Sequence, residues 1–112
     1  MVDGETLKRI LSAVAEEAKA VFAEKLESVI LYGSYARGDA DDESDIDVMI
    51  LADVAQTDEF YYTRLLHKRL DYLQFEHDCV LSLCVLDKKR YERYRDSLPF
   101  YRNVMNEGVL FA

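Results

Sequence analysis

Two short groups of residues in this sequence have the types and the spacing that metal and phosphate chemistry needs. Gly33 and Ser34 follow the apolar run SVILY, and Asp45 and Asp47 open the apolar run VMIL after ten intervening residues. Residues two apart on a strand share a face at about 6.5 Å, so the two carboxylates repel each other unless a cation lies between them. Magnesium takes such oxygens and keeps positions open for phosphate. The sequence therefore predicts Asp45 and Asp47 as magnesium ligands.

The segment GSYARG has the composition of a phosphate-binding turn. Gly33 allows a phosphate to approach the backbone closely. The residues from Ser34 onward can begin a short helix whose amides face an anion. The Ser34 hydroxyl adds a hydrogen bond, and Arg37 adds a positive charge. A phosphate site facing two metal-binding carboxylates predicts phosphoryl or nucleotidyl transfer, in which metal ions activate the attacking oxygen and stabilise the leaving pyrophosphate.

The elements that must position these groups follow from the apolar periodicity. The patterns predict a helix over 3–24, strands over 28–33 and 45–52, a helix over 57–74, a strand over 79–86, helices over 87–96 and 99–108, and an apolar tail. The short link between the first two strands permits an antiparallel pair, and the helix before the third permits a parallel crossover. We expect an α/β (α+β) fold with a small mixed β-sheet packed with helices, in the order α-β-β-α-β-α-α. Residues 1–112 form a single expected domain.

The composition restricts the partners and the compartment. The 112 residues carry a formal net charge of −8, whereas a nucleic-acid binder usually presents a basic face. The acidic charge suits a basic protein partner or divalent cations, and solubility alone also accounts for it. Cys79 and Cys84 stand five apart in one expected strand and should point to opposite faces rather than pair. No signal-peptide or membrane-span pattern is present, so we expect a cytoplasmic protein without membrane contact.

The stretch GSYARGDADDESDIDVMI resembles the motif of the minimal nucleotidyltransferase (MNT) family, part of the DNA polymerase β-like superfamily. That motif is Gly-Ser, ten residues, then Asp-x-Asp, a joint spacing much rarer than either half. The resemblance implies that Gly33 and Ser34 hold the β and γ phosphates of a nucleoside triphosphate. It implies that Asp45 and Asp47 hold two magnesium ions, and that Arg37 supports the phosphates or the loop.

The family usually has a third carboxylate on the strand after the middle helix, where it helps to activate the acceptor hydroxyl. In HDCVLSLCVLD, alternate residues from Asp78 to Ser82 share one face. If this strand runs parallel to the preceding one, its beginning lies at the active end, and Asp78 is the third catalytic residue. Alignment by the apolar pattern instead favours Ser82, which cannot act as a general base at neutral pH. With Ser82 there, catalysis would be slow, or the domain would only bind nucleotide.

The resemblance implies a magnesium-dependent nucleotidyltransferase that moves NMP, here AMP from ATP, onto an acceptor. Chains of this size resemble the members encoded beside HEPN-domain proteins, which act as antitoxins and in some cases attach AMP to a tyrosine of the toxin. A HEPN-type toxin is therefore the expected partner. One alternative is a weak or inactive nucleotide-binding antitoxin that acts by complex formation. Another is transfer to a small hydroxylated molecule, such as an aminoglycoside. Nucleotide, acceptor and homo-oligomeric state stay open.

Overall fold

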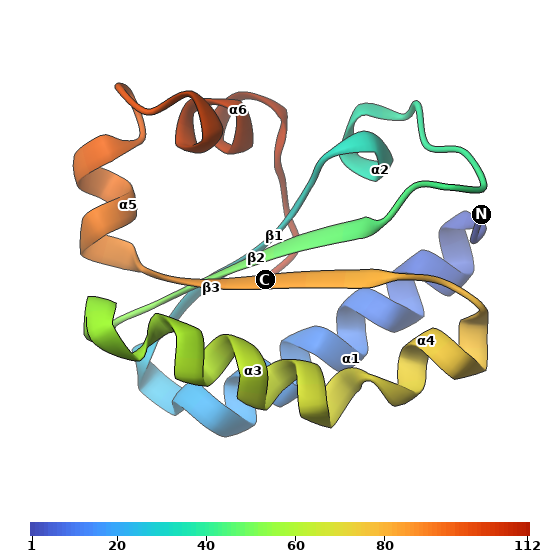
Figure 1. The fold of residues 1–112 in the computed structure, drawn as a ribbon, viewed down its shortest axis with the longest axis horizontal. Helices are drawn as coiled ribbons and strands as arrows, with labels where there is room; N and C mark the ends of the chain where they lie inside the picture. Colours follow the sequence, from blue (N-terminus) through green and yellow to red (C-terminus); the bar gives the residue numbers. More distant parts are fainter.

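The computed structural model describes residues 1–112 and places a four-stranded sheet between two groups of helices (Figure 1). One group covers the lower face of the sheet in the view: α1 (Gly4–Phe22), α3 (Glu59–Leu70) and α4 (Tyr72–His77). The other lies above it: α2 (Ser34–Arg37), α5 (Lys88–Tyr94) and α6 (Pro99–Glu107). The short 3-10 turns are η1 (Ala23–Lys25) and η2 (Gln56–Asp58). None of these helices combines the length and the apolar composition that a bilayer span requires.

The sheet has the order β3-β2-β1-β4. Its strands are β1 (Leu26–Tyr32), β2 (Ile46–Ala52), β3 (Leu81–Asp87) and β4 (Val109–Leu110). β1 runs antiparallel to β2 and β4, and β2 runs parallel to β3. The mixed α/β class and both predicted pairings are confirmed.

The C-terminal tail was predicted only as an apolar segment, and that prediction missed a strand. β4 pairs with β1, and two backbone hydrogen bonds of 2.8 Å extend the pairing: the Phe111 amide donates to the Val29 carbonyl, and the Val29 amide donates to the Ala112 carbonyl. Gly108 makes the turn from α6 into β4, and a Cβ on it would lie 2.7 Å from the Ile30 side chain. A two-residue strand has no periodicity, so only its tertiary partner reveals it.

Three predicted boundaries differ in the structure. The helix expected over 57–74 consists of η2, α3 and α4, with a break at Asp71. The strand expected from Cys79 begins at Leu81. Asp45 stands immediately before β2 rather than inside it. The N-terminal helix agrees well, because the Asp3 side chain accepts a 2.8 Å hydrogen bond from the Thr6 amide and caps it.

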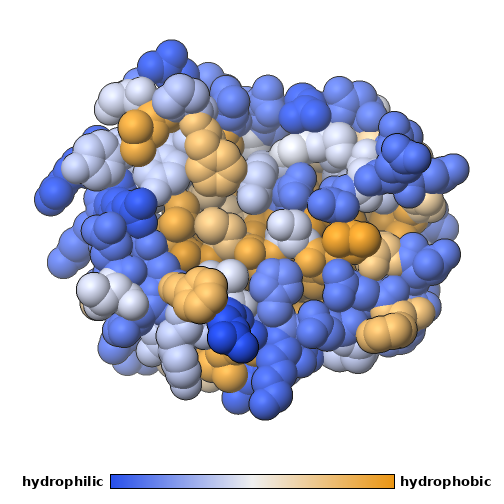
Figure 2. Space-filling view, in the orientation of Figure 1, coloured by the Kyte–Doolittle hydropathy of each residue, from blue (hydrophilic) through white to orange (hydrophobic).

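Two apolar clusters hold the layers together, one on each face of the sheet. The larger lies between the sheet and α1 and α3, and it includes Ile46, Val48 and Ile50 of β2. The smaller packs Met49 and Leu51 of β2 against side chains of α5 and α6. Figure 2 shows hydrophobic side chains gathered in the middle of the molecule with hydrophilic ones around them. Because the faces alternate along β2, Asp47 belongs to the α5–α6 face.

Side chains of α3 and α4 accept hydrogen bonds from the backbone amides on the outer edge of β3. Amides of alternate β3 residues donate to these side chains over distances of 2.7–3.2 Å. The donor–acceptor pairs are Leu81 to Gln74, Leu83 to His67, Val85 to Thr63 and Asp87 to Glu59. An edge paired in this way cannot recruit another strand, and the bonds fix β3 in its register beside β2.

Candidate active site

The Gly-Ser turn and the Asp-x-Asp strand meet at one end of the sheet. Tyr32, the last residue of β1, pairs with Asp47 of β2, so the next residue, Gly33, lies against the Asp47 side chain. A Cβ on Gly33 would overlap Oδ2 of Asp47 and lie 3.2 Å from its Cγ. Gly33 also has φ +76° and ψ −157°, a region open essentially to glycine alone. Glycine is therefore required here for both conformation and space.

Gly33 leads directly into α2, as the sequence predicted. The amides of Ala36 and Arg37 donate to the Gly33 carbonyl over 3.1 Å, so the amides of Ser34 and Tyr35 precede the first bonds of the turn. Gly38 ends the turn with φ +84°.

The acidic loop after α2 is folded by its own hydrogen bonds. The Ser44 hydroxyl accepts from the Asp41 amide over 2.9 Å, and the Asp41 side chain accepts from the Glu43 amide over 2.9 Å. The Ser44 amide also donates to the Asp41 carbonyl over 3.1 Å. These bonds direct the chain back toward β2 and set the position of Asp45. The ten residues between the two halves of the motif thus form a loop that is folded by its own hydrogen bonds.

The two carboxylates of the motif influence each other. Burial raises the pKa of Asp47, the neighbouring Asp45 charge raises it further, and the Arg37 charge opposes both. Asp45 is exposed and Asp47 is half-buried. No group of three or more acidic, histidine or cysteine side chains is close enough to enclose a metal ion. Magnesium is commonly held by one or two carboxylates plus substrate phosphates and water, so this pair fits a magnesium ion that arrives with a triphosphate.

The register of β3 bears directly on the third carboxylate. Ser82 is the β3 partner of Asp47. Asp78 is the residue that ends α4, before β3 begins, and its backbone has the left-handed conformation with φ +49°. It lines a separate hollow of about 510 Å³ together with Tyr35, Ser44 and the N-terminal residue. The geometry thus favours Ser82 as the residue beside the pair, and a catalytic role for Asp78 stays a prediction.

The sequence-based prediction missed a set of residues on α6. A hollow of about 210 Å³ separates α6 from the Gly-Ser turn. We call it the α6 hollow; it is lined by Tyr32, Gly33 and Arg37 on one side and by Phe100, Asn103 and Glu107 of α6 on the other. The α6 residues follow an i, i+3, i+7 spacing, which puts them on one helical face. That spacing is visible in the sequence, but only the fold shows that this face is opposite the motif.

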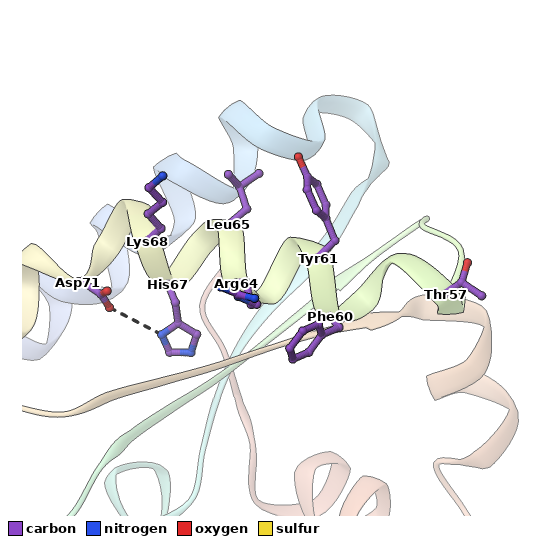
Figure 3. Close-up of a pocket in the computed structure, with 8 residues that line it drawn as sticks. All are labelled: Thr57, Phe60, Tyr61, Arg64, Leu65, His67, Lys68 and Asp71. Atoms are coloured by element: carbon purple, nitrogen blue, oxygen red, sulfur yellow. Dashed lines mark ion pairs between the residues drawn. The ribbon is translucent and has the colours of Figure 1, made fainter.

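The largest hollow on the surface lies away from the motif. It is an open groove of about 780 Å³ along the outside of α3, and none of its lining residues belongs to the Gly-Ser or Asp-x-Asp groups (Figure 3). Arg64 stacks over the Phe60 ring at 5.8 Å, and His67 faces Asp71 at 4.0 Å. α3 packs on the face of the sheet opposite to Asp47. The groove therefore takes no part in the proposed phosphate chemistry.

The fold and the site together define a class of protein. The chain belongs to the nucleotidyltransferase domain family, whose model matches residues 7–110. It is a nucleotidyltransferase, as the sequence motif predicted.

Two relatives come from Methanocaldococcus jannaschii. "Putative protein adenylyltransferase MJ0604" is 32% identical over 108 residues, which are 96% of this chain and 96% of the relative. "Putative protein adenylyltransferase MJ0141" is 50% identical over 42 residues, which are 38% of this chain and 42% of the relative.

Solved structures agree on the fold. A nucleotidyltransferase-family crystal structure from Sulfolobus solfataricus has a TM-score of 0.55 and 26% identity, and the match covers 96% of this chain and 83% of that one. A chain of the MntA–HpeT toxin–antitoxin structure has a TM-score of 0.51 and 19% identity, with 90% and 71% covered. The small mixed sheet with helices on both faces is thus a fold already seen in nucleotidyltransferase structures.

Proposed function

We propose that this protein is a magnesium-dependent adenylyltransferase that transfers AMP from ATP to a partner protein. The observation that carries the proposal is the close approach of Gly33 to Asp47, since the turn expected to bind phosphate then lies against a carboxylate expected to hold metal. The name of the relative that matches over 108 residues supports adenylyl transfer and a protein acceptor.

Each residue of the site has a defined task in this proposal. Gly33 and Ser34 bind the β and γ phosphates, and Arg37 offsets their charge from the end of α2. Asp45 and Asp47 hold two magnesium ions. When bound, magnesium supplies charge compensation for the triphosphate and activation of the attacking hydroxyl. Ser82 stands beside Asp47 and has no carboxylate, so the acceptor proton must leave through another base, and Asp78 is the candidate from this chain.

We propose a HEPN-type toxin as the acceptor and an antitoxin role for this protein in the cytoplasm. The support is the resemblance of the motif and the size of the chain to MNT antitoxins, together with the occurrence of this fold in a toxin–antitoxin structure. The net charge of −8 suits a basic partner surface.

Labelled ATP tests this function. The protein is incubated with magnesium and α-labelled ATP, with and without the product of the gene that neighbours its own. We expect label on the partner, and loss of label with Asp45→Asn and Asp47→Asn. Glu43→Gln is the matched control, since it removes one charge from the same loop and its side chain makes no hydrogen bond or ion pair in the structure.

The alternative functions predict other results. Complex formation without label, unchanged by Asp45→Asn and Asp47→Asn, would show an antitoxin that acts by contact alone, an outcome that the absence of a carboxylate at Ser82 favours. Label on an aminoglycoside and none on protein would identify a small hydroxylated acceptor.

A further inference from the structure

An ion pair joins the phosphate-binding turn to α6 across 70 positions of sequence. Arg37 Nη1 donates to Glu107 Oε2 over 3.2 Å, and Arg37 Nε donates to Asp39 Oδ2 over 3.3 Å. Hydrogen bonds to Glu107 and Asp39 raise the pKa of Arg37. In the free protein, the guanidinium is therefore already shared between two carboxylates.

This ion pair lies at the α6 hollow, beside Gly33. Glu107 is the last residue of α6, where the partial charge of the helix end is negative and a carboxylate is unfavourable. The helix end therefore does not stabilise the Glu107 carboxylate, and the favourable contact of this carboxylate is the one with Arg37. The Glu107 carboxylate therefore pairs with the Arg37 guanidinium, the positive charge that lies next to the phosphate-binding turn.

We propose that Glu107 is an internal substitute for a phosphate on Arg37, and that a triphosphate must displace it in order to bind. The inference rests on the proposed function. It makes Glu107 a specificity-determining residue, because a ligand with high negative charge gains more from Arg37 than a neutral ligand does, and so competes better with the carboxylate held at 3.2 Å. Uncharged or weakly charged nucleosides leave the pair closed.

The α6 helix is held in place independently of this ion pair. The Phe100 ring contacts the Tyr32 ring at 5.6 Å in an edge-to-face arrangement, and Tyr101 and Val104 are buried in the smaller apolar cluster. Both charged side chains of the pair are about two-fifths exposed, at 43% and 40%. Breaking the pair should therefore leave α6 docked and the fold intact, so that its effect on binding can be measured.

Calorimetric titration with the magnesium complex of α,β-methylene ATP, whose scissile bond cannot be cleaved, tests the proposal. Because an exposed ion pair is weak, we expect Glu107→Gln to lower the Kd by about two- to fivefold. Glu107→Ala should do the same. The matched control is Glu24→Gln, which removes an exposed charge in η1, at the far end of β1. Glu24→Gln should leave the Kd of the ATP analogue unchanged. The affinity for adenosine should be the same in the wild type and in every variant.

A double-mutant cycle shows whether Glu107 acts through Arg37. In an Arg37→Gln background, Glu107→Gln should no longer tighten binding. An unchanged or weaker affinity of Glu107→Gln in the wild-type background, or the same gain without Arg37, would overturn the proposal. Inorganic tripolyphosphate separates this outcome from failure of the proposed function. If the wild type binds the ligands and Glu107→Gln gains no affinity, the inference fails and the proposed function stands. If neither the wild type nor Glu107→Gln binds the analogue or tripolyphosphate, the proposed function is refuted, and the inference falls with it.

Discussion

Substitution of Gly33 by alanine measures the contact on which the site depends. The backbone of Gly33 lies in a region that costs a side-chain-bearing residue about 1–3 kcal/mol. The added Cβ also overlaps the Asp47 carboxylate, and forced overpacking costs about 1–3 kcal/mol more. We therefore expect Gly33→Ala to lower the free energy of unfolding by about 2–6 kcal/mol, the sum of the two terms.

The two contributions can be separated, because only one of them involves Asp47. In an Asp47→Ala background the overlap disappears and the backbone strain remains, so the cost of Gly33→Ala should fall to about 1–3 kcal/mol. Gly38→Ala is the matched control: Gly38 also has a positive φ, of 84°, but a Cβ there meets nothing within 4 Å. Its cost, about 1–2 kcal/mol, should be equal in both backgrounds.

Urea unfolding followed by circular dichroism gives the four free energies of each cycle. A cost of Gly33→Ala that is identical with and without Asp47 would refute the close approach of the turn to the strand. The argument for a metal-linked phosphate site would then lose its geometric basis. Titration with magnesium and the ATP analogue adds a second measurement, in which Gly33→Ala should abolish binding and Gly38→Ala should not.

Three further predictions concern the surroundings of the site. Ser82→Asp places a third carboxylate beside Asp47; it should lower the stability of the metal-free protein through like-charge repulsion and increase magnesium affinity in calorimetry. Asp3→Ala should lower the Tm at pH 7, because the Thr6 amide loses its acceptor. Hydrogen bonding lowers the pKa of Asp3 in the folded state. The wild type is therefore more stable than Asp3→Ala at pH values above the pKa of Asp3 in the unfolded chain, and the difference in Tm should vanish as the pH falls through the folded-state pKa. Glu59→Ala removes the acceptor of two hydrogen bonds, of 2.7 and 2.6 Å, from β3 and α5 and should cost about 1.5–3 kcal/mol in urea unfolding, whereas Glu59→Gln should cost less.

Local patterns were sufficient to predict most of the fold. Apolar periodicity placed α1 and β2, a short β-rich run that ends at a glycine placed β1, and Asp87 marked the start of α5. The lengths of the links gave the antiparallel and parallel pairings. The predictions that missed concern features without a local pattern. β4 is too short to show periodicity, and the break at Asp71 interrupts an apolar face that continues on both sides of it.

The site divides in the same way. Gly33, Ser34, Asp45 and Asp47 could be chosen from the sequence because one hairpin-like connection brings them together, and its length fixes their relation. The choice between Asp78 and Ser82 depended on where β3 begins. The start of β3 is set by hydrogen bonds that its edge amides donate to side chains of α3 and α4. No sequence motif predicts these bonds.

The sequence by itself determined that a glycine-serine turn and two carboxylates share one end of a small mixed sheet, since residues linked by a short loop have few ways to be far apart. Only the tertiary structure decided what surrounds them. The placement of Glu107 on Arg37, of Ser82 beside Asp47 and of Asp78 in a different hollow results from how the helices pack on the two faces of the sheet. Contacts between segments distant in the chain depend on the shape and burial of whole faces, and these emerge only when the layers assemble.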